Sequence, residues 1–445
     1  MTGLPQRVEL LTDLYELTMA ASYFENRMAE PATFSLFIRK YPPHRAYFVA
    51  AGLEDILEYI ADFQFSKDDI AFLEGTGLFS KDFLHYLKTL RFTGKIRAIP
   101  EGEIFFADEP ILEVTAPVIE AQLLETLVIN TIQVQSMIAT KAARCVHAAK
   151  GHGLVDFSLR RTHGIDAGLK VARSSYIAGF VATSNVLAGK LYHIPIAGTM
   201  AHSYVSSFGN ETEAFRAFSR SFPKKSILLV DTYDTIEGAK KAAIVGQEMA
   251  QRGERLLGVR LDSGDMTKLS QEVRKLLDEA GLEGSQVFAS GNFDEYKIEK
   301  AIKDGAKIDA FGVGTKMGVC ADAPYLDIVY KLVQYGERSI MKLSTGKVNL
   351  PGEKQVFRKV DSQGLFMGDV IATADEIVED GRPLLEPVME QGKLLRPHPS
   401  LEEIRKGFKK SFHALDEKHK ALKEPLVYPV RISTRLKELQ KAAAS

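Results

Sequence analysis

Polar and glycine-rich turns follow a series of short apolar runs between residues 150 and 320. The runs and their turns are LVDFSLRRTHG, GFVATSNV, IAGTMAHS, ILLVDTYDT, GVRLDSGD, VFASGNFDE and AFGVGTKMG. Together they supply Arg160, Arg161, His163, Ser184, Thr199, His202, Ser203, Asp231, Asp234, Arg260, Asp262, Ser263, Gly264, Asp265, Ser290, Gly291, Asn292, Gly312, Gly314 and Thr315. Arginine forks bind phosphate in bidentate fashion, and glycine lets backbone N–H groups approach phosphate oxygens. Carboxylates take ribose hydroxyls or Mg²⁺. This combination of residues is typical of a site for a phosphorylated sugar.

Each of these residues also has a structural interpretation. Arg160 and Arg161 could be surface charges, although their place directly after LVDFSL favours a site at a strand end. His202 could be a hydrogen-bonded structural histidine. Asp262 and Asp265 could cap the helix that begins near Met266, and capping suits Asp265 better.

Two phosphate-binding motifs are absent from the chain. The segment GVGTKMG lacks the GxGxxG spacing of a dinucleotide fingerprint, and no GxxxxGK[ST] sequence occurs. A P-loop kinase is therefore disfavoured.

The elements that must position these turns follow a strand, turn and helix rhythm. Amphipathic helices such as Met266–Ala280 and Asp294–Asp304 separate the later turns. This repetition predicts βα units with a parallel sheet, and seven such units favour an irregular, TIM-like barrel over an open sheet. The turns would then lie at the carboxyl ends of the strands, where barrel enzymes place their active sites.

The flanking regions have a different rhythm. Asp13–Phe24 reads as a helix and Ala32–Arg39 as a strand, whereas Asp327–Tyr335 and Ser339–Ser344 alternate like a hairpin. We therefore expect a barrel over 118–325, inserted into an α/β domain. That domain would be built from residues 1–117 and 326–445, packed together.

Charge and cysteine content restrict the class of protein. The 57 basic and 58 acidic residues leave a formal net charge of -1, so no global field favours nucleic acid or an anionic membrane. Cys145 and Cys320 lack metal-ligand spacing and predict neither a disulfide framework nor a zinc site. The first residues lack the apolar core of a signal peptide, and Ala121–Ala143 is interrupted by polar residues. We expect a cytoplasmic protein without a membrane span.

Seven motifs in this order resemble the nicotinate phosphoribosyltransferase family, a type II phosphoribosyltransferase group. They are LLTDLYELTMA (10–20), FSLRRTHG (157–164), GTMAHS (198–203), DTYDT (231–235), GVRLDSGD (258–265), ASGNFDE (289–295) and FGVGTKMG (311–318). The motifs extend over most of the chain, and their combination is far more specific than any one of them. The resemblance implies transfer of a ribose 5-phosphate group from phosphoribosyl pyrophosphate to nicotinate in NAD salvage.

The resemblance also implies roles for individual residues and partners. Tyr15 and Phe157 would sandwich the pyridine ring, and Arg160 would lie at the base and phosphate end of the pocket. Arg260 and Asp262 would face the ribose and the ring. Gly291, Gly312 and Gly314 would cradle the 5-phosphate, and His202 would be phosphorylated by ATP. The family further implies Mg²⁺, ATP as co-substrate, and a homodimer in which the partner chain supplies the tyrosine-bearing segment.

The remaining substrate alternatives depend on the ring substituent. Nicotinamide-using relatives carry an acidic residue near the stretch that corresponds to 182–185, and this chain has Ala-Thr-Ser-Asn there. A carboxylate at that place would repel the carboxylate of nicotinate, so its absence favours the acid. A nicotinamide or quinolinate phosphoribosyltransferase is the alternative, although quinolinate enzymes are usually shorter chains. A non-catalytic sugar-phosphate-binding regulator is a rival of another class, but polar groups after so many strands argue against it.

Overall fold

The chain forms two compact units in the computed structural model, which describes residues 8–342 and 349–444. Unit 1 comprises Met1–Thr140 and Ala323–Ser445, and unit 2 comprises Lys141–Asp322. We expected the central region to begin at residue 118. The compact unit begins later because α6 (Glu125–Ala149) is one continuous helix that contains the boundary.

Both ends of the chain contribute strands to the largest sheet of unit 1. Its order is β13 (Arg338–Ser339), β12 (Ile328–Tyr335), β1 (Pro31–Ile38), β5 (Leu112–Pro117), β3 (Lys95–Ala98), β17 (Glu386–Glu390) and β18 (Lys393–Leu394). All of its pairs are antiparallel. Strand β1 is buried along most of its length because β12 and β5 flank it. The second strand of the expected hairpin ends at Ser339, and residues 343 and 344 lie outside the described residues.

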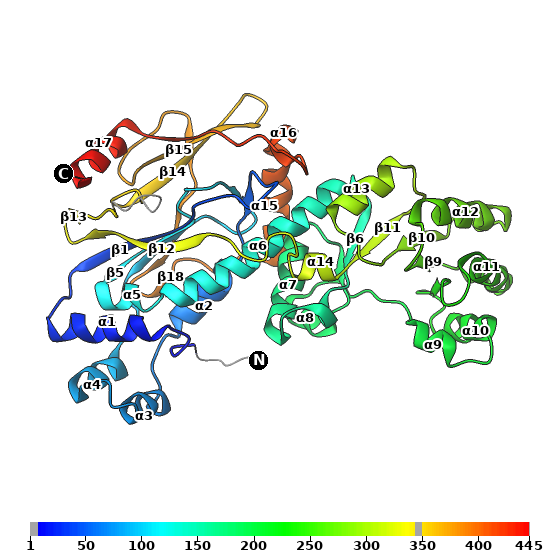
Figure 1. The fold of residues 1–445 in the computed structure, drawn as a ribbon, viewed down its shortest axis with the longest axis horizontal. Coiled ribbons are helices and arrows are strands. Elements are labelled where there is room, and N and C mark those ends of the chain that lie inside the picture. Colours follow the sequence, from blue (N-terminus) through cyan, green and yellow to red (C-terminus); the bar gives the residue numbers. More distant parts are fainter. Residues whose placement is uncertain (1–7, 343–348, 445) are drawn as a thin grey trace. The chain divides into compact units, whose positions relative to one another are not determined.

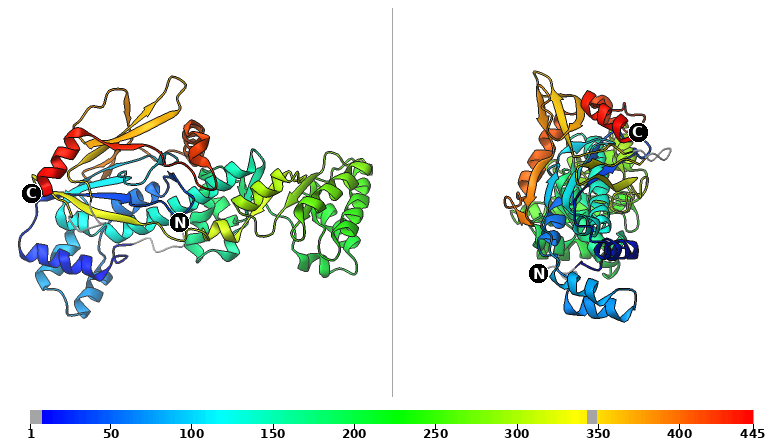
Figure 2. Two further views of the ribbon diagram at one scale, coloured as in Figure 1. Left: turned by 45° about the horizontal axis from the view of Figure 1, so that its top comes forward. Right: turned by 90° about the vertical axis from the view of Figure 1, so that its left-hand side faces the viewer.

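Two smaller sheets and a set of helices complete unit 1. One sheet has the order β16 (Gly381–Pro383), β14 (Lys354–Val360), β15 (Phe366–Thr373) and β19 (Val430–Ile432), and the other pairs β2 (Phe48–Val49) with β4 (Ile104–Phe105). The helices are α1 (Leu14–Glu25), α2 (Leu53–Ala61), α3 (Lys67–Gly75), α4 (Lys81–Thr89), α5 (Val118–Gln122), α15 (Leu401–Ala414), α16 (Glu417–Lys420) and α17 (Thr434–Ala444). Helices α3 and α4 pack together on the side of unit 1 away from β14 and β15 (Figures 1 and 2).

Unit 2 contains the parallel sheet that the strand and turn pattern predicts. Its order is β7 (Ala182–Thr183), β6 (Gly153–Asp156), β11 (Ala310–Val313), β10 (Gln286–Ala289), β9 (Gly258–Leu261) and β8 (Ile227–Leu229). Every pair in it is parallel, and the sheet is curled. The mixed α/β class is therefore confirmed.

The seventh expected strand is reduced to a single bridge. Ile196 makes an isolated parallel bridge to Thr183, and the ordered sheet has six strands instead of seven. Pro195 lacks an N–H group, so the short run before Gly198 can donate few ladder bonds. The segment extends the sheet beyond β7 without forming a regular strand.

Helices connect and cover the strands of unit 2. They are α7 (Ile165–Ile177), α8 (Val186–Tyr192), α9 (His202–Ser206), α10 (Glu211–Ser221), α11 (Thr235–Gln251), α12 (Met266–Glu279), α13 (Glu295–Lys303) and α14 (Thr315–Gly318). Helices α11 and α12 lie beside each other and next to β9 and β10 (Figure 1). Asp265 caps α12 by accepting a bond from the Lys268 N–H at 3.2 Å, as expected from its position. Across the described residues, no helix is both long and apolar enough to cross a membrane.

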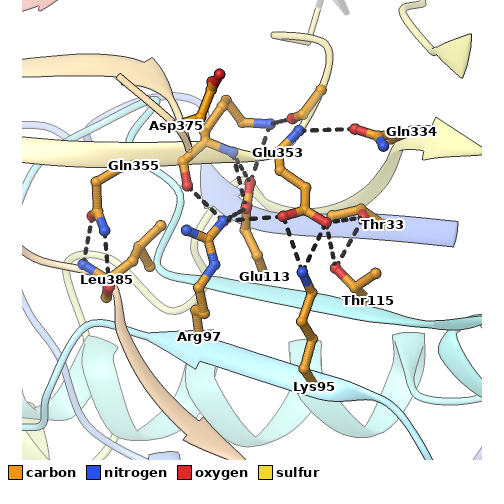
Figure 3. A network of polar contacts seen from close by, with 12 residues as sticks. Thr33, Lys95, Arg97, Glu113, Thr115, Gln334, Glu353, Gln355, Asp375 and Leu385 are labelled. Atoms are coloured by element: carbon orange, nitrogen blue, oxygen red, sulfur yellow. Dashed lines mark hydrogen bonds and ion pairs between the residues drawn. The ribbon is translucent and has the colours of Figure 1, made fainter. Parts of the chain in front are cut away.

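A partly buried polar network joins the two chain segments of unit 1 (Figure 3). Glu353 accepts bonds from the hydroxyls of Thr33 and Thr115 at 3.3 and 3.2 Å, and it pairs with Lys95 at 3.2 Å. Arg97 lies 3.8 Å from the same carboxylate. Burial by itself would raise the pKa of Glu353, but Lys95 and Arg97 hold that pKa below its usual value.

We predict that Glu353→Gln lowers the free energy of unfolding of unit 1 by about 1.5–3 kcal/mol at pH 7, the range for a hydrogen bond to a charged group. The pKa of Glu353 is lower in the folded state, so its contribution is complete above the unfolded-state pKa of about 4.3. The contribution is lost as the pH falls through the folded-state pKa. Urea unfolding should therefore show a large difference in unfolding free energy between wild type and variant at pH 7. The difference should be smaller at a pH below the folded-state pKa of Glu353.

Glu337→Gln is the matched control, because Glu337 is exposed in the turn between β12 and β13. It should leave the unfolding free energy nearly unchanged. A difference for Glu353→Gln that does not depend on pH would contradict an electrostatic role for this carboxylate.

Candidate active site

The parallel sheet gathers almost all of the predicted site residues within unit 2. The turns that follow the strands and the first residues of α9 and α14 carry most of them: Phe157, Arg160, Ser184, Thr199, His202, Ser203, Asp231, Asp262, Ser263, Gly264, Ser290, Gly291, Asn292, Gly314 and Thr315. Arg260 and Gly312 lie within β9 and β11. Parallel strands end at the same edge of a sheet, so these turns share one edge. Tyr15 is the exception, because it lies on α1 of unit 1.

Hydrogen bonds tie the turns after β8, β9 and β10 to one another. One oxygen of Asp231 accepts the Asp262 N–H at 3.0 Å and the Ser263 hydroxyl at 2.6 Å. The hydroxyl of Ser290 donates to the Asp262 carboxylate. The other Asp231 oxygen, Oδ1, is buried and has no hydrogen-bond partner within the described residues. Asp262 is thus held by bonds to both Asp231 and Ser290, and Asp231 Oδ1 remains available as an acceptor.

Arg260 provides an unsatisfied donor beside this cluster. It extends from β9, and its Nη1 donates to the Thr199 hydroxyl. Its Nε is buried, and the described part of the chain contains no acceptor for it. Burial lowers the pKa of Arg260, and the positive charge of Arg160 adds to the lowering, while Asp262 and Asp231 oppose it. A guanidinium remains protonated in such surroundings, so Arg260 presents a positive charge and a free N–H to an incoming anion.

His202 stands between two of the strand-end turns. Its Nδ1 lies 3.2 Å from the Thr232 hydroxyl, and its Nε2 lies 3.8 Å from Asp262 Oδ2. The side chain keeps 44% of its surface exposed, so a large reactant can reach it. Both ring nitrogens therefore face polar groups at the edge of the sheet. The contact of Nε2 with Asp262 is longer than a hydrogen bond.

Phe157 forms an aromatic wall at the carboxyl end of β6. Its ring packs against Phe288 with centroids 5.6 Å apart and planes tilted by 44°. A Cβ at Gly312 would lie 2.6 Å from the Phe157 ring, so glycine leaves the space that this ring occupies. The packing gives Gly312 a steric role that we did not expect; its predicted contact with phosphate stays a prediction.

A cavity of about 480 Å³ opens beside this wall. Its lining includes Phe157, Ser184, Ile196, Thr199, Lys225 and Phe288. Small-molecule sites typically enclose 300–1,000 Å³ with mostly apolar walls and a few polar groups. Thr199 connects the cavity to Arg260 through their hydrogen bond, which places a largely apolar space next to the Arg260 guanidinium.

The backbone at the other strand ends is tightly constrained. Gly291 has φ +101°, and a Cβ there would lie 2.1 Å from the Asp262 carbonyl oxygen. Asn292 adopts φ 56°, in the left-handed region. At Gly314 a Cβ would lie 3.0 Å from the Phe157 carbonyl oxygen, just before Thr315 begins α14. Close approach of these turns explains the glycines, and the predicted cradle for phosphate stays a prediction.

The remaining predicted residues are exposed. Arg160, Arg161 and His163 follow β6, and Ser203 lies on α9. Tyr15 keeps 46% of its surface exposed. Burial of its hydroxyl and the nearby Glu125 carboxylate raise the pKa of Tyr15, so its phenol stays neutral.

Sequence reasoning missed three residues that hold the site together. Thr232 contacts His202, Thr183 directly precedes Ser184, and Asp156 is a buried carboxylate that accepts bonds from Ser158 and Thr183. A carboxylate inside the apolar run LVDFSL was a usable signal, because buried charges require partners.

Metal binding by side chains alone has little support in the described ranges 8–342 and 349–444. No group of three or more His, Cys, Asp or Glu side chains is arranged there to hold a metal ion. Asp231 and Asp262 are two carboxylates in one cluster, which matches the few protein ligands that Mg²⁺ takes when phosphates supply the others.

Comparisons with known proteins match nearly the whole chain. Models of the nicotinate phosphoribosyltransferase (NAPRTase) N-terminal domain, the NAPRTase family and the C-terminal domain match residues 10–133, 152–344 and 378–440. A nicotinate phosphoribosyltransferase of Mycobacterium tuberculosis (strain ATCC 25618 / H37Rv) is 47% identical over 429 residues, which cover 96% of this chain and 92% of that protein. The nicotinate phosphoribosyltransferase of Bacillus subtilis (strain 168) is 38% identical over 457 residues, covering 96% and 93%.

The fold gives the same result. The crystal structure of human nicotinic acid phosphoribosyltransferase superimposes with a TM-score of 0.86 at 31% identity, covering 97% of this chain and 99% of that one. The sequence motifs and these matches agree. The chain belongs to the nicotinate phosphoribosyltransferase family.

Proposed function

We propose that this protein is a nicotinate phosphoribosyltransferase that forms nicotinate mononucleotide and pyrophosphate from nicotinate and phosphoribosyl pyrophosphate, in NAD biosynthesis and in the cytoplasm. One observation carries the proposal within the site. Arg260 Nε and Asp231 Oδ1 are buried and have no hydrogen-bond partner among the described residues. Arg260 also bonds to Thr199, which lines the cavity that Phe157 walls. Unsatisfied buried polar groups are costly, so a ligand with both acceptor and donor groups is the simplest account of them.

The parallel sheet supports an irregular barrel as the scaffold of this site. The bridge between Thr183 and Ile196 continues the sheet past β7, and Ile227 of β8 lines the same cavity from the other end of the sheet. We propose that these edges enclose the substrate.

The reaction requires positioning more than covalent help from the protein. The ring nitrogen of nicotinate attacks the anomeric carbon, a C–N bond forms, and the C–O bond breaks with its electron pair leaving on pyrophosphate. Positive charge develops on the ribose in the transition state. Arg260 binds an anionic group, Asp262 and Asp231 face developing positive charge and hydroxyls, and Phe157 orients the ring. Aromatic stacking adds about 0.5–1.5 kcal/mol per pair beyond area burial.

Mg²⁺ fits the acidic cluster as a partner of the substrate. Asp231 Oδ1 is a buried acceptor that receives no hydrogen bond from any described residue, and Asp262 lies in the same cluster. These two carboxylates would hold the ion, which when bound neutralises charge on the pyrophosphate group.

We predict that nicotinate is a far better substrate than nicotinamide. Ser184 lines the cavity, and residues 182–185 offer no carboxylate to accept a bond from the amide. Measurement of kcat/KM from pyrophosphate release with nicotinate, nicotinamide and quinolinate should favour nicotinate by at least about tenfold, or roughly 1.4 kcal/mol. Equal or better use of another ring acid or amide would overturn the substrate assignment.

Ser184→Asp tests the contact itself. The added charge should depress nicotinate use through repulsion and narrow the gap to nicotinamide. Ser184→Asn is the neutral control of the same shape, and it should affect nicotinate less. Identical behaviour of both variants would show that residue 184 does not meet the ring substituent.

We further propose a homodimer with shared sites. Tyr15 belongs to the motif set of the ring pocket but lies on α1 of unit 1, whereas Phe157 lies in unit 2. Tyr15→Ala and Arg260→Ala chains should each be nearly inactive. Mixing them by co-expression should restore activity, because some mixed dimers contain one intact site.

The control for this experiment is a mixture of Phe157→Ala with Arg260→Ala, since both changes fall in unit 2 and should not complement. If sedimentation shows that the protein is a monomer and this monomer is fully active, the shared site is contradicted.

We propose that His202 carries a phosphoryl group that couples ATP hydrolysis to synthesis. One nitrogen lone pair is the only nucleophile required: it takes the γ-phosphoryl group of ATP, and ADP leaves with the bond electrons. The bound phosphoryl adds negative charge beside Asp262. A hundredfold change in substrate affinity would need only about 2.7 kcal/mol.

Gamma-labelled ATP should yield a base-stable, acid-labile label in the wild type, and no label in His202→Asn. The variant should keep slow transfer without ATP, because the ring and ribose contacts remain. Thr232→Val removes the hydroxyl that contacts His202 Nδ1 but retains the imidazole, so this variant should still take the label. Labelling of His202→Asn would assign the carrier role to another residue.

A further inference from the structure

A buried carboxylate connects two turns of the proposed ring pocket. Asp156 is the last residue of β6 and is fully buried. Its Oδ1 accepts the Ser158 N–H at 2.9 Å and the Ser158 hydroxyl at 2.5 Å. Its Oδ2 accepts the Thr183 hydroxyl at 2.7 Å. One side chain thus spans the turn after β6 and the turn after β7.

The connection continues into neighbouring elements. Thr183 Oγ1 also accepts the Asn185 N–H at 3.0 Å, and the Asn185 side chain caps α8. On the other side Ser158 lies against α14, where a Cβ at Gly318 would be 2.4 Å from the Ser158 Cβ. Ser158, Asp156 and Thr183, which we call the Asp156 clasp, therefore link β6, β7, α8 and α14.

The clasp has an unusual electrostatic character. All three bonds to Asp156 come from donors, which is the pattern of an ionised carboxylate. Within the described residues, no Lys, Arg or His side chain pairs with Asp156. Burial raises the pKa of Asp156 above its usual value, and the bonds donated by Ser158 and Thr183 oppose this rise. A buried charge held only by neutral donors makes the geometry of those donors important, because each lost bond leaves the charge less stabilised.

Each of the two turns that the clasp joins contributes a residue to the lining of the cavity. Phe157 lies between Asp156 and Ser158, and Ser184 lies between Thr183 and Asn185. Phe157 and Ser184 both line the cavity. We propose that Asp156 is a positioning residue that fixes the separation between the ring wall at Phe157 and the substituent contact at Ser184. This inference rests on the proposed function and assigns to it a residue that touches no substrate.

The clasp makes a specific kinetic prediction. Thr183→Val keeps the size of the side chain but removes the bond to Asp156, so the KM for nicotinate should rise roughly tenfold, the equivalent of about 1.4 kcal/mol. The KM for phosphoribosyl pyrophosphate should change less than about twofold, since Arg260 and Asp231 are not part of the clasp. Thr183→Ser restores the hydroxyl and should recover the wild-type KM.

A double-mutant cycle distinguishes the clasp from two independent structural bonds. Ser158→Ala removes the hydroxyl on the other side of Asp156. If the two residues act through one carboxylate, the effects of Ser158→Ala and Thr183→Val on the KM for nicotinate should be non-additive. Additive effects would show that the turns are held separately and would overturn the inference.

Ser270→Ala is the matched control. Ser270 is buried on α12, where its hydroxyl donates to the Thr267 carbonyl at 3.0 Å and accepts the Lys307 N–H at 2.9 Å. The change should lower Tm without altering the KM for nicotinate. If Thr183→Val lowers Tm as much as Ser270→Ala does and leaves the KM for nicotinate unchanged, the clasp has only a structural role and the inference is overturned.

The wild type is assayed first. A wild-type protein that releases no pyrophosphate with nicotinate would overturn the proposed function, and the inference with it. An active wild type with a Thr183→Val variant of unchanged KM would overturn only the inference. Calorimetric titration of nicotinate into each variant provides the same comparison at the level of binding and does not depend on turnover.

Discussion

Parallel strand pairing in unit 2 is the constraint on which the candidate site depends. The pairs from β7 to β8 all run in one direction, so each strand delivers its following turn to the same edge. Residues from Phe157 to Thr315 are far apart in sequence and become neighbours through this pairing alone. A reversed strand would carry its turn to the opposite edge and remove its residues from the site.

The same edge concentrates polar groups that the fold itself does not satisfy. Asp231 Oδ2 accepts bonds from Asp262 and Ser263, whereas its Oδ1 has no partner in the described part of the chain. In the same way, Arg260 Nη1 donates to Thr199, whereas its Nε has no acceptor there. Buried polar groups normally find partners in the protein, and departures from that rule mark strained or functional places. Unit 2 therefore holds these groups in position, while part of their bonding capacity has no protein partner among the described residues.

Local patterns in the sequence predicted much of this arrangement. Apolar runs followed by polar turns identified the strands and the turns of unit 2, and Asp265 was recognisable as a helix cap before Met266. In the same way, Ser66 and Asp69 form a capping box that was a readable signal for α3, which we did not predict. These features depend on residues within a few positions of one another, and sequence reasoning is strongest at that range.

Contacts between distant residues were not predictable. The steric requirement at Gly312 arises from the Phe157 ring, and the requirement at Gly291 arises from the Asp262 carbonyl group. The Asp156 clasp joins two strands that become adjacent only after folding. The expected regular strand at Ile196 formed a single bridge, because a short run after a proline offers few ladder bonds. Each of these cases depends on sheet order and packing, which a local pattern does not contain.

The most direct test of the central claim is a crystal structure of the protein with nicotinate mononucleotide bound. The account predicts that the pyridine ring lies in the cavity between Phe157 and Ser184, with an anionic group of the ligand on Arg260 Nε. A nucleotide bound elsewhere, for example in the cavity of unit 1 beside Leu57 and Ile404, would contradict it.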